Sequence, residues 1–279
     1  METEIEKTMD ETLGNFVTVT AKTRVAVIIP MYGYWSDIPD NPLIKEKVFD
    51  FVMSRIWNPK GLPISEHYLY YIFVANPQTI PTDPKDRKSV ANFMLKMAQG
   101  GNVKSVPVDR EASYPEYIEA GMDCALNETN AQFVVIFNPW VMIQENAIDI
   151  IVDRANRSDQ AKVISGFDFR SITEPENFDR AKINIPTEEW DVSFNFMAMP
   201  RWLAEMITID ANYLTHDFLE RDIWQAVFSK GFGVITSQRI PIFPFDFPWD
   251  KYETKEQHEQ DKAYFGKKWG FIPDLPQDK

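Results

Sequence analysis

"AQFVVIFNPWVMIQENAIDIIVDRA", residues 131–155, contains the pattern that decides the fold class. An apolar run, residues 133–137, stops at Asn138-Pro139-Trp140, and a stretch with apolar residues at helical spacing follows. A buried strand that ends at a polar turn before a helix is typical of an α/β protein. Such proteins bind ligands in the crevice beyond the carboxyl ends of their strands. We therefore expect this turn to lie at a functional edge of a sheet.

The same alternation of strands and helices continues on both sides of this stretch. The expected strands are residues 24–30, 68–75, 103–108 and 133–138, and the expected helices are residues 43–57, 89–99, 114–126 and a segment containing 147–152. This order predicts a mostly parallel sheet with helices on both faces. Beyond residue 160 we expect strands at 161–169, 192–199 and 234–245, and a helix at 213–230.

The chain is expected to form a single α/β domain, residues 23–247, with an extension at each end. Residues 1–22 are a polar, acidic tail, and residues 248–279 are charged and aromatic. Aromatic side chains in a terminal extension favour packing onto the body of the protein or onto a second subunit. A homo-oligomer formed through the C-terminal extension is therefore one expectation.

Composition narrows the class of protein. The 279 residues are 44% hydrophobic, which allows a large buried core. A formal net charge of -13 disfavours nucleic acid and anionic membranes as partners. The single cysteine, Cys124, excludes an intrachain disulfide, and the acidic start is unlike a secretory signal. With no apolar run long enough for a membrane span, we expect a soluble, cytoplasmic protein.

Two segments of the first half carry a resemblance to a known family. "VAVIIPMYGYW", residues 25–35, is similar to the opening strand of family 2 glycosyltransferases, which ends in Pro-x-Tyr-Asn. Pro30 and Tyr32 match, and Gly33 replaces the asparagine. In residues 110–140, Gly121 and Ala125 match the family's glycine and alanine on the helix before the metal-site strand.

Two later segments extend the resemblance to most of residues 24–240. "VIFNPWVMIQENAIDII" resembles the family's Leu-Asn-Pro-Asp segment, with Asn138 and Pro139 kept and Trp140 in place of the aspartate. "IDANYLTHDFLERDIWQAVFSKGFGV", residues 209–234, resembles the late acidic segment on a helix near the acceptor, where Glu220, Asp222 and Gly231 fit. The four segments occur in the family's order.

The resemblance implies a GT-A fold and a function. It implies that a nucleotide-sugar donor binds at the carboxyl edge of the sheet, that a divalent cation bridges its diphosphate, and that a carboxylate deprotonates the hydroxyl of a glycan or other acceptor. Inversion by direct displacement is the expected stereochemistry. The candidate donor-binding residues are Pro30, Tyr32, Asn76, Arg110, Gly121, Asn138 and Trp140.

The cation site departs from the family pattern. Trp140 replaces the metal-binding aspartate, and tryptophan cannot ligate Mg²⁺ or Mn²⁺, which prefer oxygen. Asn76 stands where the family has an aspartate that contacts the base, and its amide can still hydrogen-bond a base. The metal is lost, or other oxygens hold it, or an Arg or Lys such as Arg110 replaces it. Trp140 is either a stacking platform for a sugar or base, or a core residue.

The late helix offers candidate carboxylates. Glu220 and Asp222 are the candidates for the catalytic base, with Glu220 preferred, because residues two apart on a helix point in different directions. Both would otherwise be solvated helix charges. His216 and Asp217 are candidate metal ligands, or simply the start of the helix. Residues 194–202, "FNFMAMPRW", are expected either near the acceptor or in an ordinary half-buried strand.

Three functions remain after this comparison. The first is an active glycosyltransferase, and its metal dependence stays open. The second is a catalytically inactive GT-A-like module used for binding or assembly, which the replaced aspartates favour. The third is a glycosyltransferase that acts on DNA bases, which the acidic surface disfavours because a DNA-binding face should be basic.

Overall fold

A computed structural model describes residues 23–32, 67–76, 102–109, 111–138, 141–143, 146–157, 161–168, 195–244 and 252–272. In chain order the elements are β1 (Arg24–Pro30), β2 (Tyr68–Ala75), β3 (Asn102–Pro107), α4 (Tyr114–Glu128), β4 (Phe133–Phe137), β5 (Val141–Ile143), α5 (Ala147–Arg157), β6 (Ala161–Asp168), β7 (Phe196–Pro200), α6 (Arg201–Ala204), α7 (His216–Ser229), β8 (Gly233–Pro244) and α8 (Lys255–Trp269). The expected helices at 43–57 and 89–99 lie outside the described residues.

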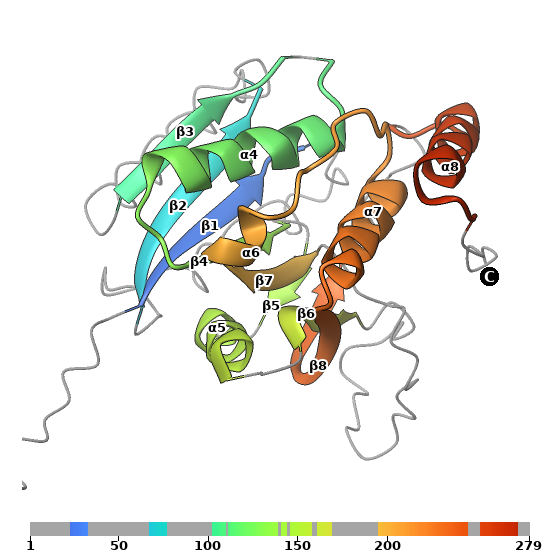
Figure 1. Cartoon of the computed structure of the whole chain (residues 1–279). Coiled ribbons are helices and arrows are strands. Elements are labelled where there is room, and N and C mark those ends of the chain that lie inside the picture. The colour runs from blue at the N-terminus through green and yellow to red at the C-terminus, as the bar shows by residue number, and fades with distance from the viewer. Residues whose placement is uncertain are drawn as a thin grey trace, which may run out of the picture.

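These strands form one eight-stranded sheet in the order β3-β2-β1-β4-β7-β6-β8-β5 (Figure 1). The strands β1, β2, β3 and β4 are mutually parallel, and β6 is parallel to β8. β7 runs antiparallel to both β4 and β6, and β5 runs antiparallel to β8. The expectation of a mostly parallel sheet flanked by helices is therefore confirmed.

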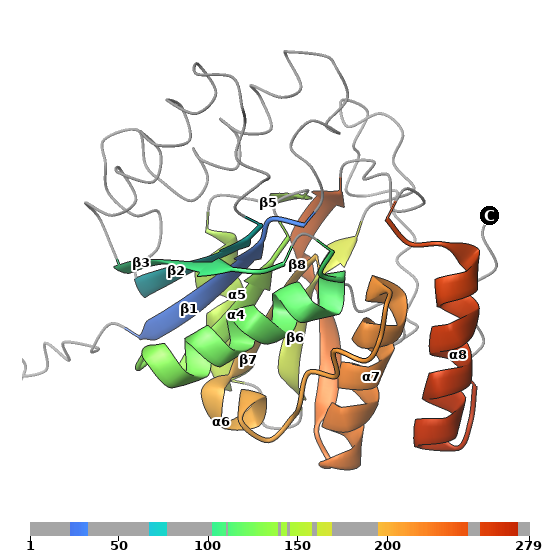
Figure 2. The same cartoon turned by 90° about the horizontal axis from the view of Figure 1, so that it is seen from above.

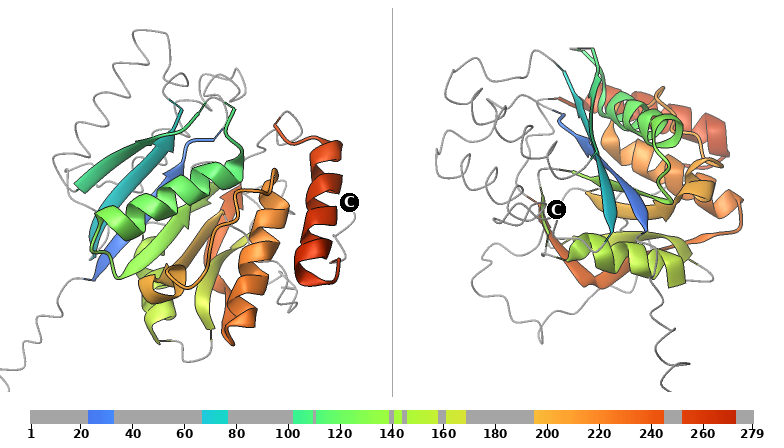
Figure 3. Two further views of the ribbon diagram at one scale, coloured as in Figure 1. Left: turned by 45° about the horizontal axis from the view of Figure 1, so that its top comes forward. Right: turned by 90° about the vertical axis from the view of Figure 1, so that its left-hand side faces the viewer.

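Both faces of the sheet are buried, which is why the strands are continuous apolar runs rather than alternating ones. Val25, Val27 and Ile29 of β1 face one core, and Ala26 and Ile28 face the other. Helices α4, α6 and α7 contribute to the core that contains Ile28, and α5 contributes to the opposite core (Figure 3). The strand β5 and the one-turn helix α6 were not expected from the sequence, because each is too short to show a period.

The carboxyl ends of the parallel strands meet at one edge of the sheet. Pro30 pairs with Val74, and Phe137 pairs with Phe196, the first residue of β7. β8 starts at the opposite edge, where Gly233 pairs with Ala161. Since α7 ends only a few residues before β8, its first turn must lie at the carboxyl edge. The late acidic helix thus begins beside the ends of β1, β2 and β4.

Capping residues explain where α7 ends and where α8 begins and ends. Gly231 has φ 81°, the left-handed conformation that glycine adopts easily, and it stops α7 where the sequence predicts. Thr254 and Gln257 form a reciprocal capping box at the start of α8, with hydrogen bonds of 3.2 Å and 2.7 Å. Gly270, with φ 80°, ends α8.

The helix α8 lies beside α7 (Figure 2). Phe265 is fully buried and packs with Phe218 and Tyr213 of the body. Phe271 and Ile272, just after α8, stay exposed at 45% and 54%. These contacts use much of the aromatic surface of the extension within one chain, and a homo-oligomer through the extension remains a prediction.

No helix among the described residues is long and apolar enough to cross a membrane.

Candidate functional site

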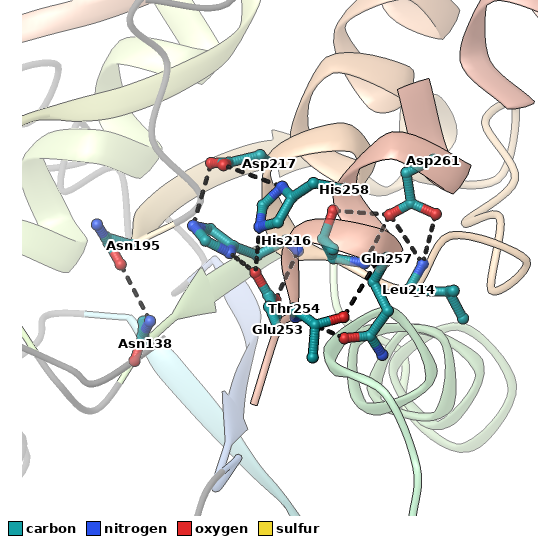
Figure 4. Close-up of polar contacts among 11 residues, drawn as sticks. Asn138, Asn195, Leu214, His216, Asp217, Glu253, Thr254, Gln257, His258 and Asp261 are labelled. Carbon is teal, nitrogen blue, oxygen red and sulfur yellow. Dashed lines mark hydrogen bonds and ion pairs between the residues drawn. The ribbon is translucent and has the colours of Figure 1, made fainter. Parts of the chain in front are cut away.

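The candidate site is built on the carboxyl edge of the sheet, where the strand ends place two buried amides. Asn76 follows β2 and Asn138 follows β4, and each is 2% exposed. The side-chain nitrogen of Asn138 donates to the side-chain oxygen of Asn195 at 3.0 Å, and its backbone N–H donates to the carbonyl of Asn195 at 2.8 Å (Figure 4). Asn138 therefore links the end of β4 to the residue before β7 through two hydrogen bonds.

Tyr32 lies at the same edge, two residues beyond β1, inside an aromatic cluster. Its ring packs edge-on against Tyr114 and Tyr117, with centroids 5.5 Å and 5.3 Å away, and lies tilted against the ring of Tyr252 at 5.5 Å. Burial and the negative charge of Glu253 raise the pKa of Tyr32 above its usual value. The phenol thus stays neutral beyond the pH at which a free tyrosine ionises.

Gly121 packs against the face of the sheet, and its expected role in donor binding remains a prediction. A Cβ atom at this position would be 2.4 Å from Cγ2 of Ile28 and 3.1 Å from Cγ2 of Val74. Ile28 is in the middle of β1, paired with Ile136. The glycine therefore allows α4 to approach the strands closely, and Pro30 likewise sits within the buried sheet as the last residue of β1.

In the segment 194–202, expected either near the acceptor or in a half-buried strand, residues 196–200 form β7, which is buried along its whole length. β7 runs away from the carboxyl edge, so Arg201 lies at the opposite edge of the sheet. There its guanidinium donates to the carbonyl of Thr129 at 2.9 Å. Among the described residues of this segment, Asn195 is the one that contacts Asn138 at the candidate site.

His216 and Asp217 lie in the first turn of α7 and contact each other (Figure 4). The Nε2 atom of His216 is 3.1 Å from Oδ1 of Asp217, and its Nδ1 atom is 2.6 Å from Oε2 of Glu253. Burial opposes the charged imidazolium, but Asp217 and Glu253 outweigh it and raise the pKa of His216 to about 10. Burial also opposes the charge of Asp217, yet the hydrogen bond with His216 lowers its pKa to about 2.

This pairing bears on the metal candidates. A histidine ligates a metal through a neutral ring nitrogen, and both nitrogens of His216 are engaged with carboxylates. Within the ranges that the structure describes, no group of three or more His, Cys, Asp or Glu side chains is arranged to hold a metal ion. A divalent-cation site that includes His216 and Asp217 remains a prediction.

Glu220 and Asp222 point to different surroundings, as their helical spacing predicts. Asp222 is 1% exposed and faces α8. Its carboxylate accepts hydrogen bonds from the hydroxyl of Tyr213 at 3.0 Å, Nζ of Lys268 at 2.9 Å and Nε1 of Trp269 at 2.7 Å. Glu220 lies on the side of Tyr114: burial, then the charges of Glu220 and Glu253, hold the pKa of Tyr114 well above its usual range.

Several residues of the site were not found from the sequence. Glu253 is 4% exposed and lies against His216, and His258 of α8 lies 3.9 Å from Asp217 and 3.8 Å from Glu253. The capping box at Thr254 and the glycine at residue 270 together predict a helix that carries His258, but they do not identify Glu253. Arg110 and Trp140, both expected at the donor site, lie outside the described residues.

Comparison with known proteins agrees with this architecture. No family model and no curated protein sequence matches the chain. Among solved structures, the mannosyltransferase PcManGT from Pyrobaculum calidifontis, in complex with GDP-Man and Mn²⁺, has a TM-score of 0.52 at 13% identity, covering 92% of this chain and 67% of that one. Glucosyl-3-phosphoglycerate synthase from Mycobacterium tuberculosis, in complex with Mg²⁺ and UDP, has 0.52 at 14% identity, covering 91% and 82%.

TarS from S. aureus, as residues 1-349 in complex with UDP, has a TM-score of 0.52 at 10% identity, covering 91% of this chain and 68% of that one. The chain spans 41% of a longer TarS structure. At such low identity the likeness is one of fold. The chain has a GT-A-like fold.

Proposed function

We propose that this protein is a glycosyltransferase that moves a sugar from a nucleotide-sugar donor to an acceptor hydroxyl, with inversion. One observation carries the proposal: the first turns of α7 place carboxylates at the edge where β1, β2 and β4 end. In an open α/β sheet this is the edge where ligands bind. The GT-A-like fold and the three nucleotide or nucleotide-sugar complexes among the similar structures support it.

The reaction needs a base and a stabilised leaving group. The acceptor oxygen forms a bond to the anomeric carbon, and the bond from that carbon to the diphosphate oxygen breaks. The bonding electrons leave with the diphosphate, and the hydroxyl proton passes to a carboxylate within hydrogen-bond reach. A single displacement of this kind inverts the anomeric centre.

We propose Glu220 as the carboxylate that takes the proton. Asp222 is the weaker candidate, because its oxygens already accept three hydrogen bonds and one of the donors is a lysine. Asp217 shares a face of α7 with Glu220, since the two are three residues apart. Glu220→Gln should lower kcat by about 100-fold or more while leaving donor affinity unchanged. If Asp217→Asn abolishes transfer and Glu220→Gln does not, the base is Asp217, one turn earlier in α7.

We propose that donor binding does not depend on a divalent cation. The support comes from the side chains available as metal ligands. Amides rather than carboxylates follow β2 and β4, and both ring nitrogens of His216 contact carboxylates. The leaving diphosphate would then be stabilised by hydrogen-bond donors and cationic side chains, with Arg110 as a candidate.

The test is calorimetry with UDP-, GDP-, dTDP- and CMP-sugars, each with Mn²⁺ and with EDTA. Tight binding of one donor that survives EDTA is the expected result. Binding only with Mn²⁺ would refute metal independence while supporting donor recognition.

The buried amides at both strand ends also favour a second candidate, an inactive GT-A-like module for binding or assembly. This alternative predicts no binding of any donor at millimolar concentration, with or without the cation. Micromolar binding of one donor would count against it.

A further inference from the structure

Glu253 is a buried carboxylate outside the domain expected from the sequence, and it is directed at the first turn of α7. Its side chain is fully buried. Oε1 accepts a hydrogen bond from the backbone N–H of His216 at 2.8 Å, and Oε2 lies 2.6 Å from Nδ1 of the same residue. One carboxylate therefore holds both the backbone and the side chain of His216, which fixes the orientation of the imidazole (Figure 4).

The orientation of His216 in turn fixes that of Asp217. With Nδ1 engaged by Glu253, the opposite nitrogen, Nε2, is directed at Oδ1 of Asp217 at 3.1 Å. A buried carboxylate, a buried imidazole and a partly exposed carboxylate thus form a chain that leads from the C-terminal extension to the candidate site. The exposed end of this chain is on the face of α7 that Glu220 shares.

A second carboxylate of the extension holds the backbone just before α7. Asp261 of α8 accepts from the backbone N–H groups of Leu214 and Thr215, at 3.0 Å and 2.8 Å, and from the hydroxyl of Thr215 at 2.7 Å. The first N–H groups of a helix have no partner within the helix, so an external carboxylate both satisfies them and favours the positive end of the helix dipole. Three consecutive residues, 214–216, are therefore held by carboxylates from the extension.

The same segment contacts the donor side of the edge. Tyr252, next to Glu253, packs against Tyr32 with ring centroids 5.5 Å apart. Tyr114 lies between the two sides, 5.5 Å from Tyr32 and 6.5 Å from the ring of His216. Residues 252 and 253 thus bridge the turn after β1 and the start of α7.

We propose that Glu253 is a positioning residue, which acts through His216 to hold the carboxylates of the first turns of α7 in place for transfer. Through Tyr252, Glu253 and Asp261, the extension accordingly supports the candidate site. The expected effect on sugar transfer rests on the proposed function. The expected effect on the start of α7 rests on the contacts alone.

The experiment compares Glu253→Gln with wild type, and uses Glu259→Gln as the matched control, because Glu259 is exposed on α8. The glutamine keeps the volume and one acceptor oxygen but removes the charge that faces His216. We expect kcat per donor-binding molecule to fall by about 100-fold, the effect of a misplacement near 1 Å, with the KM for donor within about twofold. If Glu253→Gln only reduced the fraction of folded molecules, kcat per donor-binding molecule would stay the same as in wild type. An unchanged kcat per donor-binding molecule would therefore overturn the inference.

Amide hydrogen exchange supplies a readout that does not depend on activity. Exchange at residues 214–219 should become faster in Glu253→Gln than in wild type or Glu259→Gln, while exchange in α4 stays the same. If the wild-type chain transfers no sugar, the proposed function fails, and exchange still decides whether Glu253 holds the start of α7. Equal exchange in all three proteins would overturn the positioning role.

Discussion

Replacing Asp222 by alanine should weaken the packing of α8 on α7. The carboxylate accepts from three side chains, two of which, Lys268 and Trp269, belong to the last turn of α8. The third donor, the hydroxyl of Tyr213, comes from the loop before α7. Alanine removes all three acceptor contacts and leaves the phenol, the indole N–H and one side of the ammonium without their partner.

The expected cost follows from the burial of this group. Asp222 is 1% exposed, so its hydrogen bonds are charge-assisted and poorly screened, and each is worth about 1.5–3 kcal/mol. They are not additive, because Lys268 keeps its contact with Asp210 at 2.7 Å and is itself 30% exposed. Breaking a buried ion pair by removing one partner costs about 3–5 kcal/mol, and we expect a value at the lower end of that range.

Urea unfolding followed by far-UV circular dichroism measures this cost, and a double-mutant cycle with Lys268→Ala isolates the ion pair. Asp153→Ala is the control, because Asp153 pairs with Arg157 at 3.0 Å on the surface, with both side chains more than half exposed. Such a pair is worth about 0–1 kcal/mol. A loss below about 1 kcal/mol for Asp222→Ala, equal to that of the control, would refute the assignment of Asp222 as an anchor of α8.

Other changes test packing and charge. Gly121→Ala places a Cβ 2.4 Å from Cγ2 of Ile28 and should cost about 1–3 kcal/mol in thermal unfolding. In Gly266→Ala the Cβ meets Cγ1 of the exposed Ile272 at 3.0 Å, and this change should be neutral or stabilising. Equal effects of the two changes would contradict the close approach of α4. The pKa of His216 is raised to about 10 from 6.5, so its contribution to stability is complete below pH 6.5 and is lost as pH rises through about 10. The difference in unfolding free energy between wild type and His216→Gln should therefore shrink between pH 7 and pH 10, and a constant difference would show that His216 is not charged in the fold.

The strands were predictable because this sheet is buried on both faces. Apolar runs such as residues 24–30 and 68–75 coincide with β1 and β2, and the turn at Asn138 ends β4 as expected. The helix α8 was not predicted, because Asp261 and Phe265 are its only residues buried in the protein, and a helix with so narrow a contact shows little hydrophobic periodicity. Tertiary contacts, rather than a local pattern, hold it in place.

Part of the candidate site was likewise predictable from the sequence, and part was not. The different directions of Glu220 and Asp222 follow from helical spacing alone, and that expectation agrees with the contacts of Asp222. The partner of His216 could not be predicted, because Glu253 is 37 positions away and only the docking of α8 brings it close. An acidic residue in a charged segment has no feature in the sequence that distinguishes a buried anchor from a solvated charge.

The contact between Tyr32 and Tyr252 has a consequence for how the protein forms. These residues flank almost the whole of the sheet in the chain, so the edge that carries the candidate site closes only after nearly every strand has been synthesised. Contacts of such long sequence separation are slow to form, because the closure entropy must be overcome first. A nascent chain that is released from the ribosome only as far as α7 would expose the first N–H groups of that helix, and the edge of β6 that β8 later covers would still be open.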